Sequence, residues 1–286
     1  MIRPQNKNRR HRNISYTKHL FIIQLFFVFF LVSACNPVIT FLSFHPDDRY
    51  IIPQTLLPKG MEEVFIETKD GVTIQALYLP HPSSKRFTIY FHGNAGNIYH
   101  RIHDYEKLHK LGTSILAVSY RGYAKSEGYP SESGIYLDGK AAFDFVKNII
   151  KVSEKNIYIL GRSIGTTVAV DLAQDTDIGG LILISPLSSG QDQASFMGLG
   201  FAAQLATNAF QNEKKVRRLK APLLVIHGNQ DKIIPIDFGL KVFKAATSVR
   251  FFYEVKGGGH NNLTSKFGDQ VFSAVSDFFS KTHNTK

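Results

Sequence analysis

The sequence predicts an α/β fold built on a mostly parallel eight-stranded sheet with helices on both faces. Eight short runs rich in β-branched and aromatic residues recur along the chain, and from the third run onward each leads into a segment of helical length. This alternation is typical of parallel strands joined by crossover helices. With 286 residues, 43% of them apolar, the chain is long enough to bury one such core.

The predicted strands are separated by glycine, proline or polar residues. They occupy residues 63–67, 73–79, 87–91, 114–119, 156–160, 180–184, 223–227 and 250–255. The first two flank Lys69-Asp70-Gly71, a turn sequence that favours antiparallel neighbours. The predicted helices follow the later strands, over residues 97–111, 131–152, 164–174, 236–246 and 266–282. Together these elements predict a single catalytic domain over residues 61–286.

Residues 1–34 are predicted to be a signal peptide or a membrane anchor. A basic segment with six lysines and arginines precedes an apolar run over residues 21–34 that ends in small residues. The run is shorter than the roughly 20 apolar residues that span a bilayer. An uncleaved anchor would therefore have to continue past Asn36 and Pro37.

The single cysteine, Cys35, follows this run directly. Val32-Ser33-Ala34-Cys35 resembles the lipobox of bacterial lipoproteins, whose cysteine is acylated and becomes the new N-terminus. An incidental free cysteine is the alternative. Either kind of anchor predicts an exported, membrane-attached protein with an extracytoplasmic domain, because the basic segment stays inside. A palmitate label that persists in a Cys35→Ser variant would contradict lipidation at this residue.

The net charge of +11 does not indicate a nucleic-acid partner. Six of the positive charges precede the first acidic residue, Asp47, and the rest of the chain carries an ordinary excess of five. No nucleic-acid-binding motif accompanies them. Residues 35–60, the tether, contain four prolines and show no helical or strand period, so we expect them to lie against the domain.

The alternation of strands and helices lapses over residues 186–220, where the pattern becomes helical and less regular. An insertion after the sixth strand lies near the carboxyl ends of the strands, where open α/β sheets bind their ligands. We therefore expect a small helical cap with contacts to an acyl chain; a further helix pair packed on the core is the alternative.

Gly161-Arg162-Ser163-Ile164-Gly165 has the form G-x-S-x-G between a predicted strand and helix. A serine hydroxyl is a weak nucleophile and must be presented beside a base. A sharp strand-to-helix turn does this, and the glycines Gly161 and Gly165 are expected because a Cβ at either position would strike the adjoining elements. Ser163 is the predicted nucleophile.

The loop after the third strand reads His92-Gly93-Asn94-Ala95-Gly96-Asn97. We expect the backbone N–H groups of Asn94 and Ile164 to form an oxyanion hole, which stabilises the negative charge of a tetrahedral intermediate. A plain glycine-rich turn is the alternative. We expect His92 itself to have a structural role.

An acid and a base follow the last two strands. Asp231 lies in the loop after the seventh strand and is predicted to orient the histidine, with Asp237 as the competing acid. His260 lies after the eighth strand and is the predicted general base. The chain order of serine, aspartate and histidine is that of the α/β-hydrolase fold.

Together with Tyr120-Arg121-Gly122-Tyr123-Ala124-Lys125-Ser126-Glu127-Gly128-Tyr129-Pro130-Ser131-Glu132, these motifs resemble a group of α/β hydrolases that includes eukaryotic membrane-attached enzymes and bacterial relatives. The resemblance covers about residues 60–282, and the group usually has glycine where Ala124 stands. It implies hydrolysis of an ester or thioester, since some relatives remove acyl chains from proteins. We expect no cofactor and no metal, because no metal-binding motif is present.

Two other functions remain open. A serine peptidase of the same fold would need acidic groups to recognise a free amino terminus, and residues 185–221 contain only Asp192 and Glu213. A catalytically silent binding module would be expected to lack a member of the triad, and none is missing. A dehalogenase is disfavoured because its nucleophile would be aspartate in place of Ser163.

Overall fold

The computed structural model describes residues 43–200, 203–204 and 206–283. The predicted signal peptide or anchor, and Cys35 with it, lie outside the described residues. Within them, no helix has both the length and the apolar character that a membrane crossing requires.

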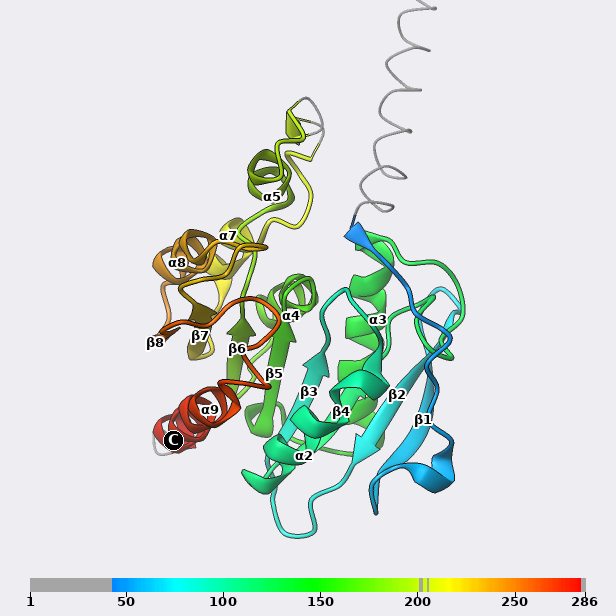
Figure 1. Cartoon of the computed structure of the whole chain (residues 1–286). Helices are drawn as coiled ribbons and strands as arrows, with labels where there is room; N and C mark the ends of the chain where they lie inside the picture. Colours follow the sequence, from blue (N-terminus) through cyan, green and yellow to red (C-terminus); the bar gives the residue numbers. More distant parts are fainter. Residues whose placement is uncertain (1–42, 201–202, 205, 284–286) are drawn as a thin grey trace, which may run out of the picture. The chain divides into compact units, whose positions relative to one another are not determined.

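An eight-stranded sheet forms the centre of the domain (Figure 1). Its order is β1-β2-β4-β3-β5-β6-β7-β8; β2 runs antiparallel to both of its neighbours, and all other neighbouring strands are parallel. The prediction of a mostly parallel sheet is confirmed. The strands are β1 (Glu62–Glu67), β2 (Thr73–Leu79), β3 (Phe87–Phe91), β4 (Ser114–Val118), β5 (Ile157–Arg162), β6 (Gly180–Ile184), β7 (Leu223–Gly228) and β8 (Arg250–Val255).

Helices cover both faces of the sheet (Figure 1). Helices α2 (Ile102–Lys110) and α9 (Gly268–His283) lie on one face, and α3 (Glu132–Asp144), α4 (Gly165–Ala173) and α8 (Ile236–Ala245) lie on the other. Every residue of β3, β4, β5, β6 and β7 is buried. A strand covered on both faces needs apolar side chains in both directions, which explains the continuous apolar runs of the sequence.

The helix predicted over residues 131–152 changes its pitch near its end. Ser131 caps the start of α3, its side chain accepting a hydrogen bond from the backbone N–H of Gly134. After Asp144 the chain continues as a π-helical turn, Phe145–Ile149. The wider π turn rotates Ile149 away from the buried face, and this side chain is 68% exposed.

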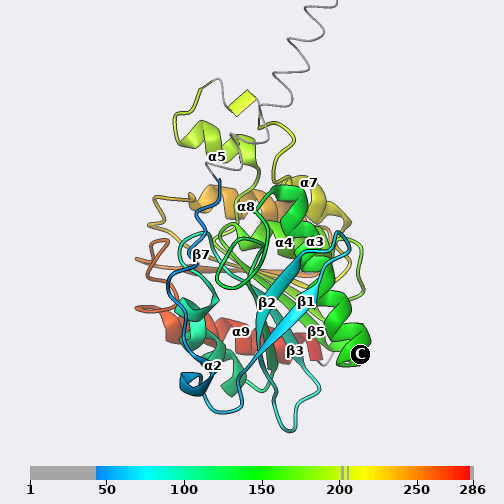
Figure 2. The same ribbon diagram turned by 90° about the vertical axis from the view of Figure 1, so that its right-hand side faces the viewer.

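The insertion between β6 and β7 stands beyond the carboxyl ends of the parallel strands (Figure 1 and Figure 2). Its described part contains α5 (Gly190–Phe196), α7 (Asn212–Lys215) and a 3-10 turn, Val216–Arg218. No residue of α5 is buried, so this helix lies at the surface, whereas Phe210, Val216 and Leu219 of the same insertion are buried. The cap contacts the loop after β7, since the side-chain amide of Gln193 donates to the carbonyl oxygen of Ile233 at 2.9 Å.

The described part of the tether, residues 43–60, packs on the domain. Phe44 and Leu57 are buried, and Leu57 joins the core cluster that α2 and α9 form with the sheet. The sequence predicts no regular element here, but the structure has a 3-10 turn at Gln54–Leu56. Proline at position 53 precedes this turn, where its lack of an N–H costs no hydrogen bond.

Candidate active site

The turn that carries Ser163 lies between β5 and α4. Ser163 has a φ of 53°, in the left-handed region that few non-glycine residues adopt. A Cβ at Gly161 would lie 2.5 Å from the carbonyl oxygen of Gly165, and one at Gly165 would lie 2.3 Å from that of Phe91. The turn is tight because both glycines allow this close approach of backbone, and it leaves the serine hydroxyl exposed to a partner.

Three residues far apart in the sequence meet at the carboxyl ends of the strands. The Nε2 atom of His260 lies 3.0 Å from the Oγ atom of Ser163, and Nδ1 of the same ring lies 2.8 Å from Oδ2 of Asp231. The Asp231 side chain is fully buried, and that of His260 is 9% exposed. Asp237, the competing acid, lies in the first turn of α8.

The carboxylate of Asp231 is held by further hydrogen bonds. Its Oδ1 atom accepts from the backbone N–H groups of Ile233 and Ile234, both at 2.9 Å. Burial raises the pKa of Asp231, but hydrogen bonds from His227 and His260 outweigh this effect and leave the pKa well below its ordinary value of 3.8. Asp231 is therefore ionised at neutral pH, and its orientation is set by the backbone of its own loop.

Two residues that sequence reasoning missed support this arrangement. His227, at the end of β7, is fully buried with Nε2 3.5 Å from Oδ2 of Asp231 and 2.9 Å from the carbonyl oxygen of Ile234. Arg162, the residue before the serine, donates from Nη2 to the carbonyl oxygen of His260 at 3.1 Å. The signal for His227 was its place on a strand four residues before an acid; nothing local marks Arg162.

The loop after β3 passes beside the serine, as the predicted oxyanion hole requires. A Cβ at Gly93 would lie 3.3 Å from the Cβ of Ser163. Within the part of the chain that the structure describes, the backbone N–H groups of Asn94 and Ile164 have no hydrogen-bond partner. Helix α4 starts at Gly165, so its positive end also lies at this place. Both N–H groups are available to an anionic ligand atom.

His92 belongs to the framework of this loop. Its Nδ1 atom lies 2.7 Å from the carbonyl oxygen of Gly93, and its own carbonyl oxygen accepts from the Tyr120 hydroxyl at 2.8 Å. Burial lowers the pKa of His92 to about 4, so the ring is neutral at physiological pH. A buried, neutral ring with these contacts fits the structural role that the sequence predicts.

The stretch after β4 holds several loops together. Arg121 bridges the turn between β1 and β2 and helix α3, pairing with Asp70 at 2.8 Å and with Asp138 at 2.9 Å. Ala124 has a φ of 48°. Glycine takes this conformation without a steric penalty, whereas the Cβ of alanine makes it less favourable.

No cluster of three or more histidine, cysteine or acidic side chains suited to a metal ion occurs within residues 43–200, 203–204 and 206–283. In the hydrogen-bonded set Asp231, His260 and Ser163, Nε2 of His260 lies within reach of the proton of the serine hydroxyl.

No family model matches this chain, but it is similar in sequence to three known proteins. An uncharacterized protein of Mycobacterium tuberculosis is 32% identical over 234 residues, which cover 80% of this chain and 82% of the relative. Protein bem46 of Schizosaccharomyces pombe is 30% identical over 231 residues, 77% of each chain. The mouse alpha/beta hydrolase domain-containing protein 17C is 32% identical over 209 residues, 71% of this chain and 63% of the relative.

The fold has close counterparts among solved structures. The esterase Pf2001 of Pyrococcus furiosus superposes with a TM-score of 0.68 at 21% identity, covering 84% of this chain and 98% of the esterase. At this identity the likeness concerns the fold. On the sequence similarity to bem46 and to the mouse hydrolase-domain protein, together with the fold, the chain belongs to the α/β-hydrolase superfamily, among the relatives of bem46.

Proposed function

We propose that this protein is a serine hydrolase that cleaves carboxylic esters or thioesters through an acyl-serine intermediate. The observation that carries the proposal is the continuous hydrogen-bonded series from Asp231 through His260 to Ser163, with distances of 2.8 and 3.0 Å. The two unpartnered N–H groups beside Ser163 supply the second requirement, a place for the negative charge that develops during acyl transfer.

In this mechanism, Oγ of Ser163 attacks the substrate carbonyl carbon while Nε2 of His260 takes the hydroxyl proton. The carbonyl π electrons move to oxygen, and the N–H groups of Asn94 and Ile164 stabilise that anion. When the intermediate collapses, the bond to the alcohol or thiol breaks and His260 returns the proton to the leaving group. Water then attacks the acyl-serine with His260 again as base, releasing the acid and restoring Ser163.

The cap favours an acyl substrate with apolar character. Phe196 and Met197 in the cap are 50% and 56% exposed, and Ile233, in the loop of the acid, is 47% exposed. Gln193 links α5 to Ile233, so these apolar side chains belong to neighbouring parts of the surface next to the proposed site. Pf2001, which shares the fold, is an esterase by name, and this agrees with an ester substrate.

The contacts of the cap disfavour the serine peptidase. Asp192 is 2.8 Å from the Lys241 ammonium group, and Glu213 is 3.3 Å from the Arg217 guanidinium group. Both acidic residues of the insertion therefore have cationic partners of their own, and neither is arranged to bind the amino terminus of a peptide.

A fluorophosphonate probe tests the proposal on the full-length protein in detergent. We expect one adduct, on the peptide that contains Ser163, and competition by p-nitrophenyl esters in the order of their preferred acyl length. His260→Ala should lose the adduct, because the hydroxyl loses its base. His103→Ala removes an exposed histidine of α2 and should label like the wild type. Folded protein without an adduct, and without ester hydrolysis, would point to the binding module instead.

A further inference from the structure

The two asparagines of the loop after β3 hold the tether. Oδ1 of Asn94 accepts from the backbone N–H of His45 at 2.7 Å. Nδ2 of Asn97 donates to the carbonyl oxygens of Asp47 at 3.0 Å and Tyr50 at 2.8 Å. Residues 45–50 are therefore tied to this loop at both of their ends.

Tyr123 adds a second link at the Asn94 end. Its hydroxyl donates to Oδ1 of Asn94 at 2.8 Å and lies 3.2 Å from the N–H of His45. The backbone N–H of Ala124 donates to the carbonyl oxygen of Asp47 at 3.1 Å. Tyr123 and Ala124, in the loop after β4, thus bind two of the tether residues that also bind the asparagines, His45 and Asp47.

These hydrogen bonds affect the proposed oxyanion hole because Asn94 contributes both the side chain that binds the tether and the backbone N–H that would bind the oxyanion. The loop has little stiffness of its own, since Gly93 and Gly96 flank Asn94 and Gly96 has a φ of 70°. Fixing Oδ1 of Asn94 restricts the rotation of its peptide N–H. Without that restraint, the donor would sample directions away from the substrate oxygen.

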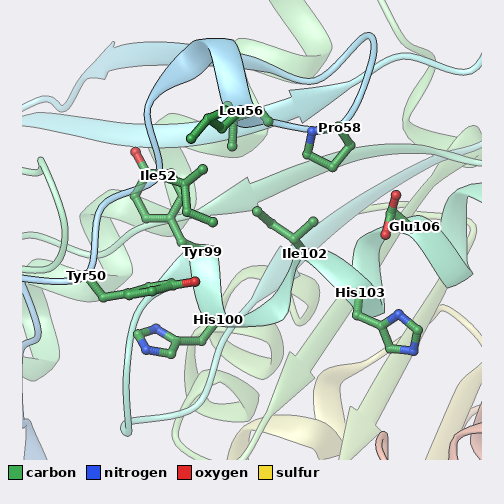
Figure 3. Close-up of a pocket in the computed structure, with 10 residues that line it drawn as sticks. Tyr50, Ile52, Leu56, Pro58, Tyr99, His100, Ile102, His103 and Glu106 are labelled. Atoms are coloured by element: carbon green, nitrogen blue, oxygen red, sulfur yellow. The ribbon is translucent and has the colours of Figure 1, made fainter.

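Apolar packing alone does not hold this part of the tether. Leu57 packs into the core, but a hollow of about 540 Å³ is lined by Tyr50, Ile52 and Leu56 on one side and by residues at the start of α2 on the other (Figure 3). Leu56, at its rim, is 73% exposed. Figure 3 shows the rings of Tyr50 and His100 side by side, with centroids 4.3 Å apart, at one end of this hollow. The hydrogen bonds from Asn97 to Asp47 and Tyr50, with that from Ala124 to Asp47, are the directional contacts at this end.

We propose that residues 45–50 are a positioning element of the oxyanion hole, acting through the side chains of Asn94 and Asn97; this inference rests on the proposed hydrolase function. The same residues follow the stretch for which the sequence predicts a membrane anchor. Residues 45–50 would then connect the predicted membrane anchor to the loop that forms the oxyanion hole.

Asn97→Asp tests the proposal in the full-length protein. The variant keeps Oδ1, which accepts from the N–H of Tyr99 and caps the 3-10 turn Ile98–Arg101, but replaces the donor to Asp47 and Tyr50 with an oxygen. We expect kcat for a p-nitrophenyl ester to fall by about 10-fold to 100-fold, with KM nearly unchanged, because a misdirected donor weakens the transition state.

Gln54→Glu is the matched control. Gln54 also lies in the tether, where its Nε2 donates to the carbonyl oxygen of Met61 at 2.9 Å and its Oε1 accepts from Glu63 at 3.0 Å. The same amide-to-carboxylate change there breaks a similar hydrogen bond away from the loop. We expect its kcat to stay within about twofold of the wild type.

The affinity for a trifluoromethyl ketone inhibitor distinguishes a role in the oxyanion hole from a purely structural role, which would leave this affinity unchanged. The ketone forms a hemiketal anion on Ser163, so its affinity reports the oxyanion hole and should fall in Asn97→Asp by the same factor as kcat/KM. A lower melting temperature with unchanged kcat and ketone affinity would show that Asn97 serves stability alone and would overturn the proposal.

Tyr123→Phe decides the question if Asn97→Asp does not fold. Phenylalanine keeps the buried ring and removes only the hydroxyl that joins His45 to Asn94, and we expect a kcat loss of about tenfold. Wild-type kcat and ketone affinity in this folded variant would overturn the proposal. Loss of the proposed function itself looks different, since the wild type and Gln54→Glu would then also lack Ser163-dependent hydrolysis.

Discussion

Ser163→Ala is expected to lower kcat for p-nitrophenyl ester hydrolysis by about 10⁶-fold, the scale seen when a serine nucleophile is removed from a working triad. Without the Oγ atom, His260 has no hydroxyl to deprotonate and no acyl-enzyme forms. The variant should fold normally, because alanine tolerates the φ of 53° at this turn about as well as serine does. Any residual rate would come from binding and from the N–H groups of Asn94 and Ile164.

The measurement compares the full-length variant with the wild type over acyl chains from short to long. Ser280→Ala, which removes an exposed hydroxyl of α9, is the matched control and should keep the wild-type rate. The chain-length profile of the wild type ranks the substrates. Equal activity in Ser163→Ala and wild type would show that a different group, or a contaminant, performs the hydrolysis.

Asp231→Asn is expected to lower kcat by about 10⁴-fold at neutral pH. The N–H groups of Ile233 and Ile234 both donate to one oxygen of the carboxylate, so they require the amide oxygen at that position. The amide NH₂ then faces Nδ1 of His260. Nδ1 has to accept this hydrogen bond, which puts the ring proton on Nε2, and Nε2 can no longer take a proton from Ser163.

Asp237→Asn separates the two candidate acids. Asp237 is exposed in the first turn of α8, and its loss should cost less than about 1 kcal/mol of stability through the helix dipole, with little change in kcat. The reverse pattern, an inactive Asp237→Asn beside an active Asp231→Asn, would show that the acid is misassigned.

The lowered pKa of Asp231 predicts that the wild type and Asp231→Asn differ in how their stability depends on pH. A carboxyl group whose pKa is lower in the folded state stabilises the protein at pH values above its ordinary pKa, here 3.8. This contribution is lost as the pH falls toward the pKa of the folded state. Wild-type stability should therefore decline below about pH 4 more steeply than that of Asp231→Asn, as followed by thermal denaturation at each pH.

The positions of the strands and of the loops after them were determined by the sequence alone. Apolar runs bounded by glycine, proline and polar residues predict all eight strands to within one or two residues of their observed ends. Since parallel strands present their carboxyl ends at one edge, residues that follow β5, β7 and β8 were bound to meet there. Ser163, Asp231 and His260 could for this reason be proposed together from local patterns.

Only the tertiary structure decided how these parts touch. The position of β4 between β2 and β3, the buried His227 beside Asp231 and the hydrogen bond from Arg162 to the His260 loop leave no mark in local periodicity. The roles of Asn94 and Asn97 toward the tether are likewise invisible, because their partners lie 47 to 50 residues away. Local patterns report propensity and burial, whereas contacts over such separations depend on how complete surfaces pack.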